Sequence, residues 1–418
     1  MNNITFTKYG ILLIGRDNMQ FISNLSEEEY TKFWESTPNN HFLQSYEWGL
    51  TQEQNRNQTP YYIGLKDDDG NIIAASLLLK KKTPLNMCYF YAPRGYTMDF
   101  DDKKLLTQFT NELKKFLKQE NAIYLKLDPP IMYQEIDEEA NKIEGGLNNY
   151  KIFNNFLNMG YKHKGFYKLY EGNQPRYTFR TYFKQYNTFE DVEKTFSKSF
   201  FRPVKRSYNY DLEVYLADEV KTFHDLIKLI SERDGFHEYS YEYYKSVYDE
   251  FSKRGHIKVY NVKINPSKLI KKFEEELKKE KNDDRKVKIQ KDIDYFKEVE
   301  QKDEYTCASL ICTYSKTGAW SLYIGNDDVA SYTGTVNRLY YEFIKDAYND
   351  GYEYADLFGV VGDPHTKYKN LAGIYEYKRK IGGQYIEFIG EFDLVNKPFW
   401  YAILPTLLKI YRKIRGSK

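Results

Sequence analysis

A tyrosine and a lysine stand side by side at Tyr377 and Lys378, near the C-terminal end of the chain. Upstream, residues 354–360 alternate aromatic and small side chains as a buried strand does, and residues 361–370 form a polar loop with Gly and Pro. An aromatic face beside a fixed ammonium can stack on a nucleobase and can stabilise a phosphate or a developing oxyanion. We therefore expect the pair to lie at the mouth of a short helix and to carry chemistry.

Basic side chains gather in two short segments of the second half of the chain. Arg202, Lys205 and Arg206 form a compact cluster beside aromatic residues, which is a pattern that can follow an RNA backbone. Arg379 and Lys380 continue the basic run after the tyrosine–lysine pair. For both segments a solvated helix face is the alternative, and the sequence leaves the two open.

Asp128 ends a predicted strand at residues 122–127 and precedes two prolines. A carboxylate at a strand terminus can point into a cleft, where it orients a substrate or accepts a proton. It can equally cap the turn by accepting backbone hydrogen bonds. Both interpretations stay open, and if Asp128 acts on a substrate we favour orientation over proton abstraction.

Length and composition limit the function classes. A chain of 418 residues is long enough for two ordinary domains, and a formal net charge of +2 means that any RNA binding must come from a local patch. The cysteines at 88, 307 and 312 form no CxxC pair, which argues against a disulfide framework and a cysteine zinc site and favours a reducing cytoplasm. The sequence has no Walker loop, no GxGxxG after a strand and no histidine zinc motif, so we expect neither a metal nor a cofactor.

The order of predicted elements repeats once along the chain. After a helix that starts at Ser26, the first half reads as a strand hairpin at 61–65 and 72–80, a helix at 105–119 and the strand at 122–127. The second half reads as helices at 223–233, 241–254 and 332–349 and strands at 256–262, 305–314, 319–325 and 354–360. This order is typical of the GNAT acyltransferase fold, so we predict a mixed α/β protein with two GNAT-like units in tandem.

Residues 266–303 are rich in charge and interrupt the sheet pattern of the second unit. Apolar residues recur at helical spacing on both sides of a turn at 282–284, so we expect an inserted antiparallel helical coiled-coil arm. One interpretation is a solvated hairpin that serves stability alone, and the other is an arm that contacts tRNA or a partner. Its mixed charge argues against a pure phosphate-binding role.

The two ends of the chain each carry a short apolar segment. Residues 1–18 are predicted to be an extension or an upstream start. Their apolar run is short and lacks a small-residue cleavage site, so we do not expect a signal peptide. The tail at 399–415 joins an aromatic–aliphatic stripe to basic residues, as peripheral membrane helices do, although docking on its own domain is favoured. We expect a cytoplasmic protein, at the inner face of the plasma membrane if the tail binds lipid.

Several short motifs occur in a fixed order along nearly the whole chain: Gln44-Ser-x-x-Trp48, Tyr91-Ala-Pro-Arg-Gly95, the strand at 123–129, Gln174-Pro-Arg176, Glu232-Arg-Asp-Gly-Phe236 and the C-terminal block. In this order and spacing the chain resembles the FemABX family of peptidoglycan bridge-forming, aminoacyl-tRNA-dependent peptidyl transferases. The resemblance implies a GNAT-like domain at 19–170 that is completed by 391–418. It implies a second GNAT-like domain at 171–390 with the arm inserted at 266–303.

The resemblance also implies an activity. Members of the family move an amino acid from aminoacyl-tRNA to the stem-peptide amine of a peptidoglycan precursor, here UDP-MurNAc-pentapeptide or lipid II. The ester is already activated, so positioning and oxyanion stabilisation should dominate catalysis. Lys378 aligns with the family lysine that stabilises the tetrahedral intermediate, Tyr377 with an aromatic that stacks on the tRNA end, and Asp128 with an aspartate considered a general base.

Tyr243 and Tyr323 align with family tyrosines that line the precursor pocket, with buried core tyrosines as the alternative. Two nearby positions depart from the family, because Gln52 and Tyr239 stand where members place phosphate-binding cations. The loss favours weaker reliance on the diphosphate, replacement by Lys81 or Arg94, or a lipid-linked acceptor. The sequence leaves these three open.

Two other function classes compete with aminoacyl transfer. One is a coenzyme-A-dependent GNAT acetyltransferase, but residues 327–334 lack the glycine loop that cradles the pyrophosphate and carry two acidic residues. The other is a non-catalytic tRNA-binding or scaffold protein that works through the arm. The amino acid transferred, the acceptor amine and the oligomeric state are open on sequence alone.

Overall fold

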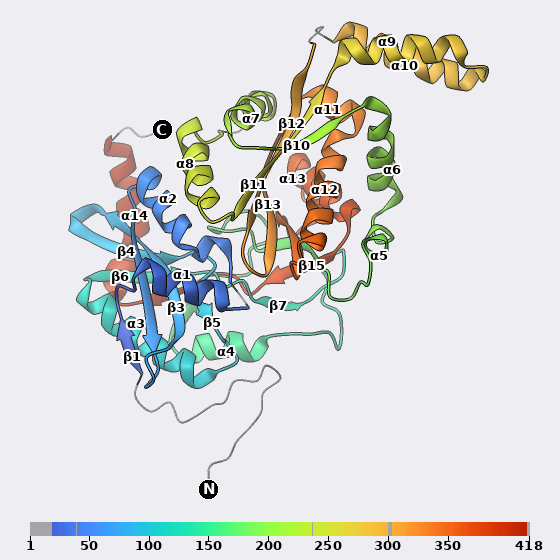
Figure 1. Ribbon diagram of the computed structural model, residues 1–418. Coiled ribbons are helices and arrows are strands. Elements are labelled where there is room, and N and C mark those ends of the chain that lie inside the picture. The colour runs from blue at the N-terminus through green and yellow to red at the C-terminus, as the bar shows by residue number, and fades with distance from the viewer. Residues whose placement is uncertain (1–18, 39, 236, 300–302, 416–418) are drawn as a thin grey trace. The chain divides into compact units, whose positions relative to one another are not determined.

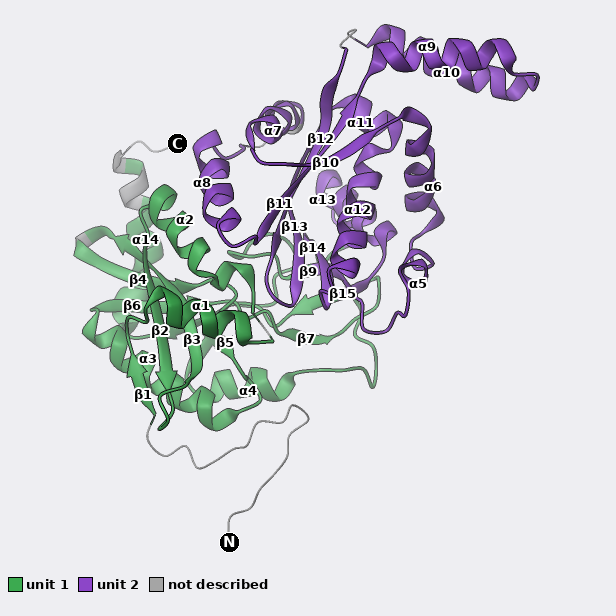
Figure 2. Cartoon of the chain, viewed as in Figure 1, with its two compact units in different colours: residues 1–177, 361–363, 386–418 green, residues 178–360, 364–385 purple. Residues whose placement is uncertain are grey.

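The computed structural model describes residues 19–415 except 39, 236 and 300–302, so the predicted N-terminal extension lies outside the described residues (Figure 1). The chain forms two compact units, one made of residues 1–177, 361–363 and 386–418 and the other of residues 178–360 and 364–385 (Figure 2). The sequence places the breaks at 170/171 and 390/391, whereas the units change at Tyr177/Thr178 and Tyr385/Ile386. Each unit has its own sheet, which confirms the mixed α/β class.

The first unit is built on a sheet in the order β1-β2-β3-β4-β6-β16-β8, with β5 paired to β3. Its strands are β1 (Gln20–Ile22), β2 (Thr59–Lys66), β3 (Ile72–Thr83), β4 (Met87–Ala92), β5 (Thr97–Met98), β6 (Ala122–Leu127), β8 (Tyr161–His163) and β16 (Phe392–Val395). Its helices are α1 (Glu27–Ser36), α2 (Tyr46–Arg56), α3 (Lys103–Gln119), α4 (Tyr150–Asn158) and α14 (Pro398–Arg415). Strands β4 and β6 run parallel, and the other neighbouring strands of this sheet pair antiparallel.

Local sequence signals explain the start of this unit. The Ser26 side chain accepts from the backbone N–H of Glu29, and the Glu29 carboxylate accepts from Ser26, which makes the predicted capping box of α1. The predicted hairpin is formed by β2 and β3, and the Asp67 carboxylate accepts two backbone N–H groups in its turn. The apolar stripe of α3, including Phe109 and Leu113, is buried in the core of the unit.

Helix α14 packs on the first unit through its apolar side. Leu404 is buried with Met87 and Ile123, and Trp400 and Leu408 pack around them. The structure therefore favours docking over membrane contact for the apolar stripe of the tail. Within the described residues, no helix combines the length and the apolar character needed to cross a bilayer.

The second unit is built on a sheet in the order β10-β11-β12-β13-β14-β9-β15. Its strands are β9 (Tyr177–Tyr182), β10 (Glu213–Ala217), β11 (Ile257–Ile264), β12 (Tyr305–Tyr314), β13 (Gly318–Asn326), β14 (Tyr354–Val360) and β15 (Gln384–Phe388). Its helices are α5 (Phe189–Glu193), α6 (Lys198–Ser207), α7 (Lys221–Asp234), α8 (Tyr241–Ser252), α9 (Pro266–Lys279), α10 (Asp283–Glu298), α11 (Asp328–Thr333), α12 (Thr335–Asn349) and α13 (Lys369–Ile381). The last residues of β15, which belong to the first unit, pair with β7 (Met132–Glu135).

Helices cover both faces of the second sheet. Helix α7 packs on β12 and β13 and α8 on β11, whereas α12 packs on β11 to β14 from the other side (Figure 1). Tyr260 of β11 points toward α12, since its hydroxyl donates to Asp346 of that helix at 2.9 Å. Tyr323 is in register with Val259, the neighbour of Tyr260, so it points to the opposite face.

The predicted single helix at 332–349 is wrong at its start. Helix α11 ends at Thr333 and α12 begins at Thr335, because Gly334 adopts a left-handed conformation with φ of +80°. A Cβ on Gly334 would lie 2.6 Å from the carbonyl oxygen of Pro203 in α6. The break therefore lets the backbones of α6 and α12 approach closely.

The predicted insertion forms two helices, α9 and α10, which leave the second unit as a hairpin (Figure 1). Its base is anchored by Phe273 and Phe296, both buried beside Tyr210. The Tyr295 ring stacks on Tyr332 of α11 at 3.6 Å between centroids. The two helices are confirmed, and their coiled-coil packing stays a prediction.

Candidate functional site

The tyrosine–lysine pair, which we expected at the mouth of a short helix, lies in the last turns of α13. Three basic residues in succession, at 378–380, suit the C-terminal end of a helix because the helix dipole is negative there. Lys378 reaches back from this end toward β14. Its Nζ donates to the carbonyl oxygens of Phe358 at 3.2 Å and Gly359 at 3.1 Å.

Lys378 is a cation in an environment that disfavours its charge. Burial lowers the pKa of the Lys378 ammonium to about 8, and the carboxylate of Asp356 opposes this only in part. An ammonium has three N–H donors, and two of them are directed at backbone carbonyls. Among the described residues the third donor has no acceptor, so it is available to a reacting group.

The carbonyl of Phe358 is aimed by a buried network around Asp356. Phe358 has a left-handed backbone with φ of +59°, which an aromatic residue rarely adopts. Oδ1 of Asp356 accepts from the Phe358 N–H at 2.7 Å and from the Thr178 hydroxyl at 2.6 Å. The Arg180 guanidinium donates twice to Oδ2 of Asp356, at 2.9 and 2.8 Å. The strained turn that receives Lys378 is therefore fixed by an ion pair behind it.

The residues of this network were missed by the sequence analysis. Asp356 lies within a strand that was predicted to be buried, and a carboxylate in such a strand signals a required partner. Arg180 in β9 is that partner. Most of the second unit lies between Arg180 and Asp356 in the sequence. Periodicity indicates which side chains point inward, but it does not indicate which two of them meet.

Tyr377 faces the interior more than expected. Its ring lies 5.7 Å from that of Tyr340, and its hydroxyl is buried without a hydrogen-bond partner among the described residues. Burial, with a smaller contribution from Tyr340, raises the pKa of the Tyr377 hydroxyl well above its ordinary value. Any contact that Tyr377 makes with a substrate must therefore use its ring.

The predicted basic residues lie on neighbouring elements of the second unit. Arg202, Lys205 and Arg206 are exposed on α6, which packs against α12 and α13. The backbone N–H of Ser197, the N-cap of α6, donates to the carbonyl of Lys380 at 3.1 Å. The basic end of α13 and the basic helix α6 therefore meet.

Not every basic side chain of this group is equally available. Arg206 donates to the carbonyl of Tyr332, and Arg379 pairs with Glu376 at 2.9 Å. Lys205 lies over the ring of Phe201 at 4.7 Å, whereas Lys380 is exposed.

Asp128 lies in the first unit and is 2 % exposed. Its carboxylate accepts from the Tyr91 hydroxyl at 2.8 Å and from the Arg94 backbone N–H at 2.7 Å. Burial raises the pKa of Asp128 to about 7, with Arg94 lowering it and Glu391 raising it further. The capping interpretation and a substrate role are compatible here, because Asp128 also lines a small cavity with Gln174 and Glu391.

The candidate phosphate-binding positions of the first unit are mostly occupied by protein contacts. The guanidinium of Arg94 lies over the Phe388 ring at 4.4 Å and donates to the Pro175 carbonyl at 2.5 Å. Gln52 is buried within α2. The Lys81 ammonium lies over the Tyr91 ring at 5.0 Å, and burial lowers its pKa.

The three predicted tyrosines of the second unit come together on the face covered by α7 and α8. The rings of Tyr239 and Tyr243 are 4.3 Å apart, and the hydroxyls of Tyr243 and Tyr323 are 3.4 Å apart. Tyr239 is 41 % exposed and Tyr243 is buried. The cluster is thus a partly exposed aromatic surface, with both a packed and an open part.

The fold and these residues define a class of protein: a two-unit α/β protein with a half-buried lysine that donates to two backbone carbonyls at a strained turn. Within the residues that the structure describes, His, Cys, Asp and Glu form no group able to hold a metal. A model of the FemAB family matches residues 25–304 and 285–409. The chain belongs to the FemAB family.

Relatives and one solved structure match along most of the chain. A lipid II:glycine glycyltransferase of Staphylococcus haemolyticus is 28 % identical, over 94 % of this chain and 99 % of the relative. Aminoacyltransferase FemA of Staphylococcus aureus is 26 % identical, with the same two shares covered. The crystal structure of FemX has a TM-score of 0.75 at 23 % identity, covering 92 % of this chain and 99 % of FemX, so the two share a fold.

Proposed function

We propose that this protein is an aminoacyltransferase that moves an amino acid from aminoacyl-tRNA to the stem-peptide amine of a peptidoglycan precursor. Its FemAB membership and the names of its relatives support transfer in peptidoglycan bridge synthesis. The observation that carries the proposal is the half-buried Lys378 ammonium, which donates to two carbonyls and has a third donor without an acceptor in the described part of the chain.

The reaction asks little of the protein beyond charge stabilisation and positioning. The acceptor amine attacks the ester carbonyl of aminoacyl-tRNA, the new C–N bond forms, and the C–O bond to the terminal ribose breaks. The carbonyl oxygen carries a negative charge between these steps, and the unused N–H of Lys378 would donate to it. The attacking nitrogen loses a proton and the ribose oxygen gains one, so no cofactor is required.

The other candidate residues take supporting roles in the proposal. The ring of Tyr377 and the basic residues of α6 and α13 would bind the end of the tRNA. The cluster of Tyr239, Tyr243 and Tyr323 would contact the precursor. Asp128 would orient a substrate or its own loop, and Gln52 and Arg94 would line the precursor site without pairing to the diphosphate.

The proposal also covers the domain types, the role of the arm and the location of the protein. The two units would be GNAT-like domains, and the α9–α10 hairpin would act as a coiled-coil arm. The reaction would take place in the cytoplasm, where charged tRNA is present. Contact of α14 with the inner face of the plasma membrane would rest on exposed side chains such as Phe399, because Trp400, Leu404 and Leu408 pack on the first unit.

Packing at the start of α12 argues against a coenzyme-A-dependent acetyltransferase. A helix N-terminus can receive a pyrophosphate only if its first N–H groups are open. Here Gly334 lies against the Pro203 carbonyl oxygen, and Asp327 caps the preceding helix by accepting from the Ala330 N–H at 2.9 Å. The Asp327 carboxylate therefore occupies the N-terminus of α11, and the Pro203 carbonyl oxygen lies close to the start of α12.

The test is mass spectrometry of the precursor after incubation with the purified protein and a charged total-tRNA pool. Soluble and lipid-linked precursors are offered in parallel, and acetyl-coenzyme A is offered in a separate reaction. We expect a mass gain of one amino-acid residue on one precursor form, which also identifies the amino acid. Lys378→Ala should lower the rate by about 100- to 1000-fold, as does removal of an oxyanion donor elsewhere.

Lys380→Ala is the matched control, because Lys380 lies on the same helix end and is exposed. It should change the rate far less than Lys378→Ala does. No mass gain on either precursor, together with acetyl transfer from the coenzyme or with tRNA binding alone, would overturn the proposal. If both lysine variants lost the same fraction of the transfer rate, Lys378 would act only as one charge of a general basic surface.

A further inference from the structure

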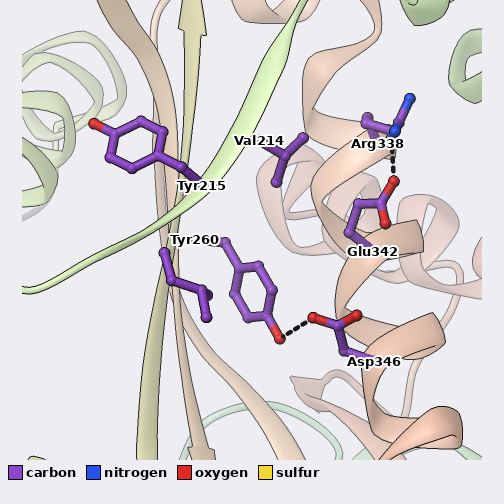
Figure 3. Close-up of a pocket in the computed structure, with 7 residues that line it drawn as sticks. Val214, Tyr215, Tyr260, Arg338, Glu342 and Asp346 are labelled. Carbon is purple, nitrogen blue, oxygen red and sulfur yellow. Dashed lines mark hydrogen bonds and ion pairs between the residues drawn. The ribbon is translucent and has the colours of Figure 1, made fainter.

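The second unit contains a cavity of about 300 Å³ that none of the proposed roles uses. Its walls are two strands and one helix, and it is lined by Val214, Tyr215, Leu216, Tyr260, Arg338, Glu342 and Asp346 (Figure 3). Tyr260 points to the α12 face of the sheet, whereas Tyr323 of the tyrosine cluster points to the other face. The cavity and the tyrosine cluster are therefore on opposite faces of the sheet.

One wall of the cavity is apolar and belongs to an edge strand. Strand β10 has a sheet neighbour on one side only, and Leu216 and Val214 are in register with Tyr260 and Val262 of β11. These side chains share the face toward α12 because residues two apart in a strand point the same way. Leu216 is nevertheless 57 % exposed. An aliphatic ligand would remove this leucine from water.

The opposite wall is charged and is supplied by one side of α12. Arg338, Glu342 and Asp346 follow each other at four-residue intervals, so they project from successive turns on the same side of the helix (Figure 3). Arg338 donates through Nε to Glu342, and its guanidinium lies over the Tyr208 ring at 3.7 Å. In the part of the chain that is described, the two outer nitrogens of Arg338 have no hydrogen-bond acceptor.

Asp346 has a different environment. Its carboxylate accepts from the Tyr260 hydroxyl at 2.9 Å, and within the described residues no basic side chain pairs with it. Lys258 pairs instead with Asp350 one turn further along, at 2.6 Å. The charged wall thus carries two carboxylates against one guanidinium. A ligand with a net charge of +1 would neutralise it.

We propose that this cavity binds a diamino carboxylic acid such as lysine, free or at the C-terminal end of a peptide. Its carboxylate would meet the outer nitrogens of Arg338, and its side-chain ammonium would pair with Asp346. Its methylene chain would cover Leu216 and Val214, and a free α-ammonium would meet Glu342. Arg338 and Asp346 lie two turns apart on α12, about 12 Å, which an extended diamino acid can bridge with a hydrogen bond at each end.

The test is isothermal titration calorimetry on the full-length protein with L-lysine, L-norleucine and the dipeptide Ala-Lys, up to about 10 mM. Norleucine keeps the carboxylate and the stem but lacks the side-chain ammonium. We expect lysine or Ala-Lys to bind and norleucine to bind at least about tenfold more weakly, because it loses a charge-assisted hydrogen bond. A preference for Ala-Lys would indicate a peptide terminus, and a preference for lysine a free amino acid.

Asp346→Asn should weaken lysine binding by at least about tenfold, since the amide keeps the contact with Tyr260 but loses the charge. Asp350→Asn is the matched control, because Asp350 lies on the same end of α12 outside the cavity, and it should bind as the wild type does. Equal binding of lysine and norleucine, no binding of lysine or Ala-Lys, or unchanged affinity in Asp346→Asn would overturn the proposal. The norleucine comparison needs only wild-type protein, so the test holds even if a variant fails to fold.

This inference is independent of the proposed aminoacyl transfer. The cavity shares no residue with the Lys378 network or the tyrosine cluster. Failure of lysine binding would leave the transfer reaction untouched, and failure of transfer would leave the binding site untouched.

Discussion

At the scale of single residues, Lys378 is the position where the protein accepts a cost in stability. The folded protein lowers the pKa of this ammonium to about 8, whereas an unfolded chain restores the ordinary value near 10.4. The unfolded chain therefore binds more protons between these two values, so this residue opposes folding most at neutral and lower pH. A group kept under such conditions is more easily explained by function than by stability.

The charge of Lys378 leads to a prediction about pH. If the ammonium is the active form, the rate of aminoacyl transfer should fall as the pH rises through about 8, by up to tenfold per pH unit. Single-turnover rates from about pH 6 to about pH 9.5, corrected for ester hydrolysis, measure the effect. Lys378→Arg, normalised to its own maximum, should lack the decline because a guanidinium stays charged throughout. The same profile in both proteins would contradict an acidic role for Lys378.

Asp128 gives a second prediction, this time about stability. Burial raises its pKa to about 7 in the folded protein, so the folded state binds more protons than the unfolded state between about pH 4 and 7. Stability then decreases as the pH rises through this range. Tyr91 and Arg94 donate to different oxygens of Asp128. Asp128→Asn keeps an oxygen for the Arg94 N–H, and its NH2 group can donate to the Tyr91 hydroxyl oxygen, so the variant should be more stable than wild type at pH 8, by about 1 to 3 kcal/mol.

Thermal unfolding at pH 5 and pH 8 measures the effect, and the gain should shrink at the lower pH. A variant that is less stable than wild type at both values would show that the carboxylate is needed as an ion. Transfer activity separates the two roles of Asp128 at the same time. If it orients groups, the amide variant should retain most of the rate, and if it accepts a proton the variant should lose about 100-fold or more.

At the scale of elements, the sequence predicts those structures that depend only on residues close together in the chain. The capping box at Ser26, the β2–β3 hairpin and the helix over the apolar stripe of Phe109 and Leu113 were all predicted, because each depends on neighbours in sequence. The left-handed Phe358 was not predictable. Its conformation depends on the side chain of Asp356, and that side chain is fixed by Arg180 from a distant strand.

The break between α11 and α12 falls between these two cases. Gly334 could have been recognised as a helix end, since glycine is the usual residue at a left-handed C-terminal cap. The reason that no other residue fits there depends on packing, because the carbonyl of Pro203 approaches from α6. Sequence alone therefore indicates where the helix breaks, and the structure indicates how much the break matters.

A comparison of two glycines measures that packing contribution. Gly334 and Gly255 have similar φ values, +80° and +72°, but a Cβ on Gly255 would meet nothing within 4 Å. Gly255→Ala should lose about 1 kcal/mol from the left-handed conformation alone, and Gly334→Ala about 2 to 4 kcal/mol because a backbone clash is added. Urea unfolding of both variants gives the comparison. Equal losses would mean that α6 moves away from α12 without cost.

At the scale of the whole molecule, the α9–α10 hairpin divides into an anchored base and an exposed tip. Every residue of α9 and α10 that is buried, including Phe273, Ile293 and Phe296, lies near the base. The tip at 278–288 has no buried residue, and Val287 is 70 % exposed there. Six basic residues against three acidic ones give this tip a positive charge, whereas the rest of the hairpin, at 266–277 and 289–298, has five basic residues against six acidic ones.

This distribution separates the two interpretations of the arm. Replacing residues 278–288 by a short Gly-Ser turn should leave the melting temperature within about 2 °C of wild type, since no buried contact is lost. Phe296→Ala, at the base, should instead cost about 3 to 5 kcal/mol through the cavity it leaves. If the tip contacts tRNA, its removal should weaken binding and make the salt dependence of affinity shallower.

Titration of labelled tRNA at several salt concentrations, with the wild type, the shortened arm and Val287→Ser, measures this effect. Val287→Ser removes the exposed apolar side chain of the tip and keeps every charge, so it should bind tRNA as the wild type does. A shortened arm with an unchanged salt slope and a lower melting temperature would make the hairpin a purely stabilising element. A loss of affinity with retained stability would place the tip on the tRNA, because the tip then contributes to binding without contributing to the fold.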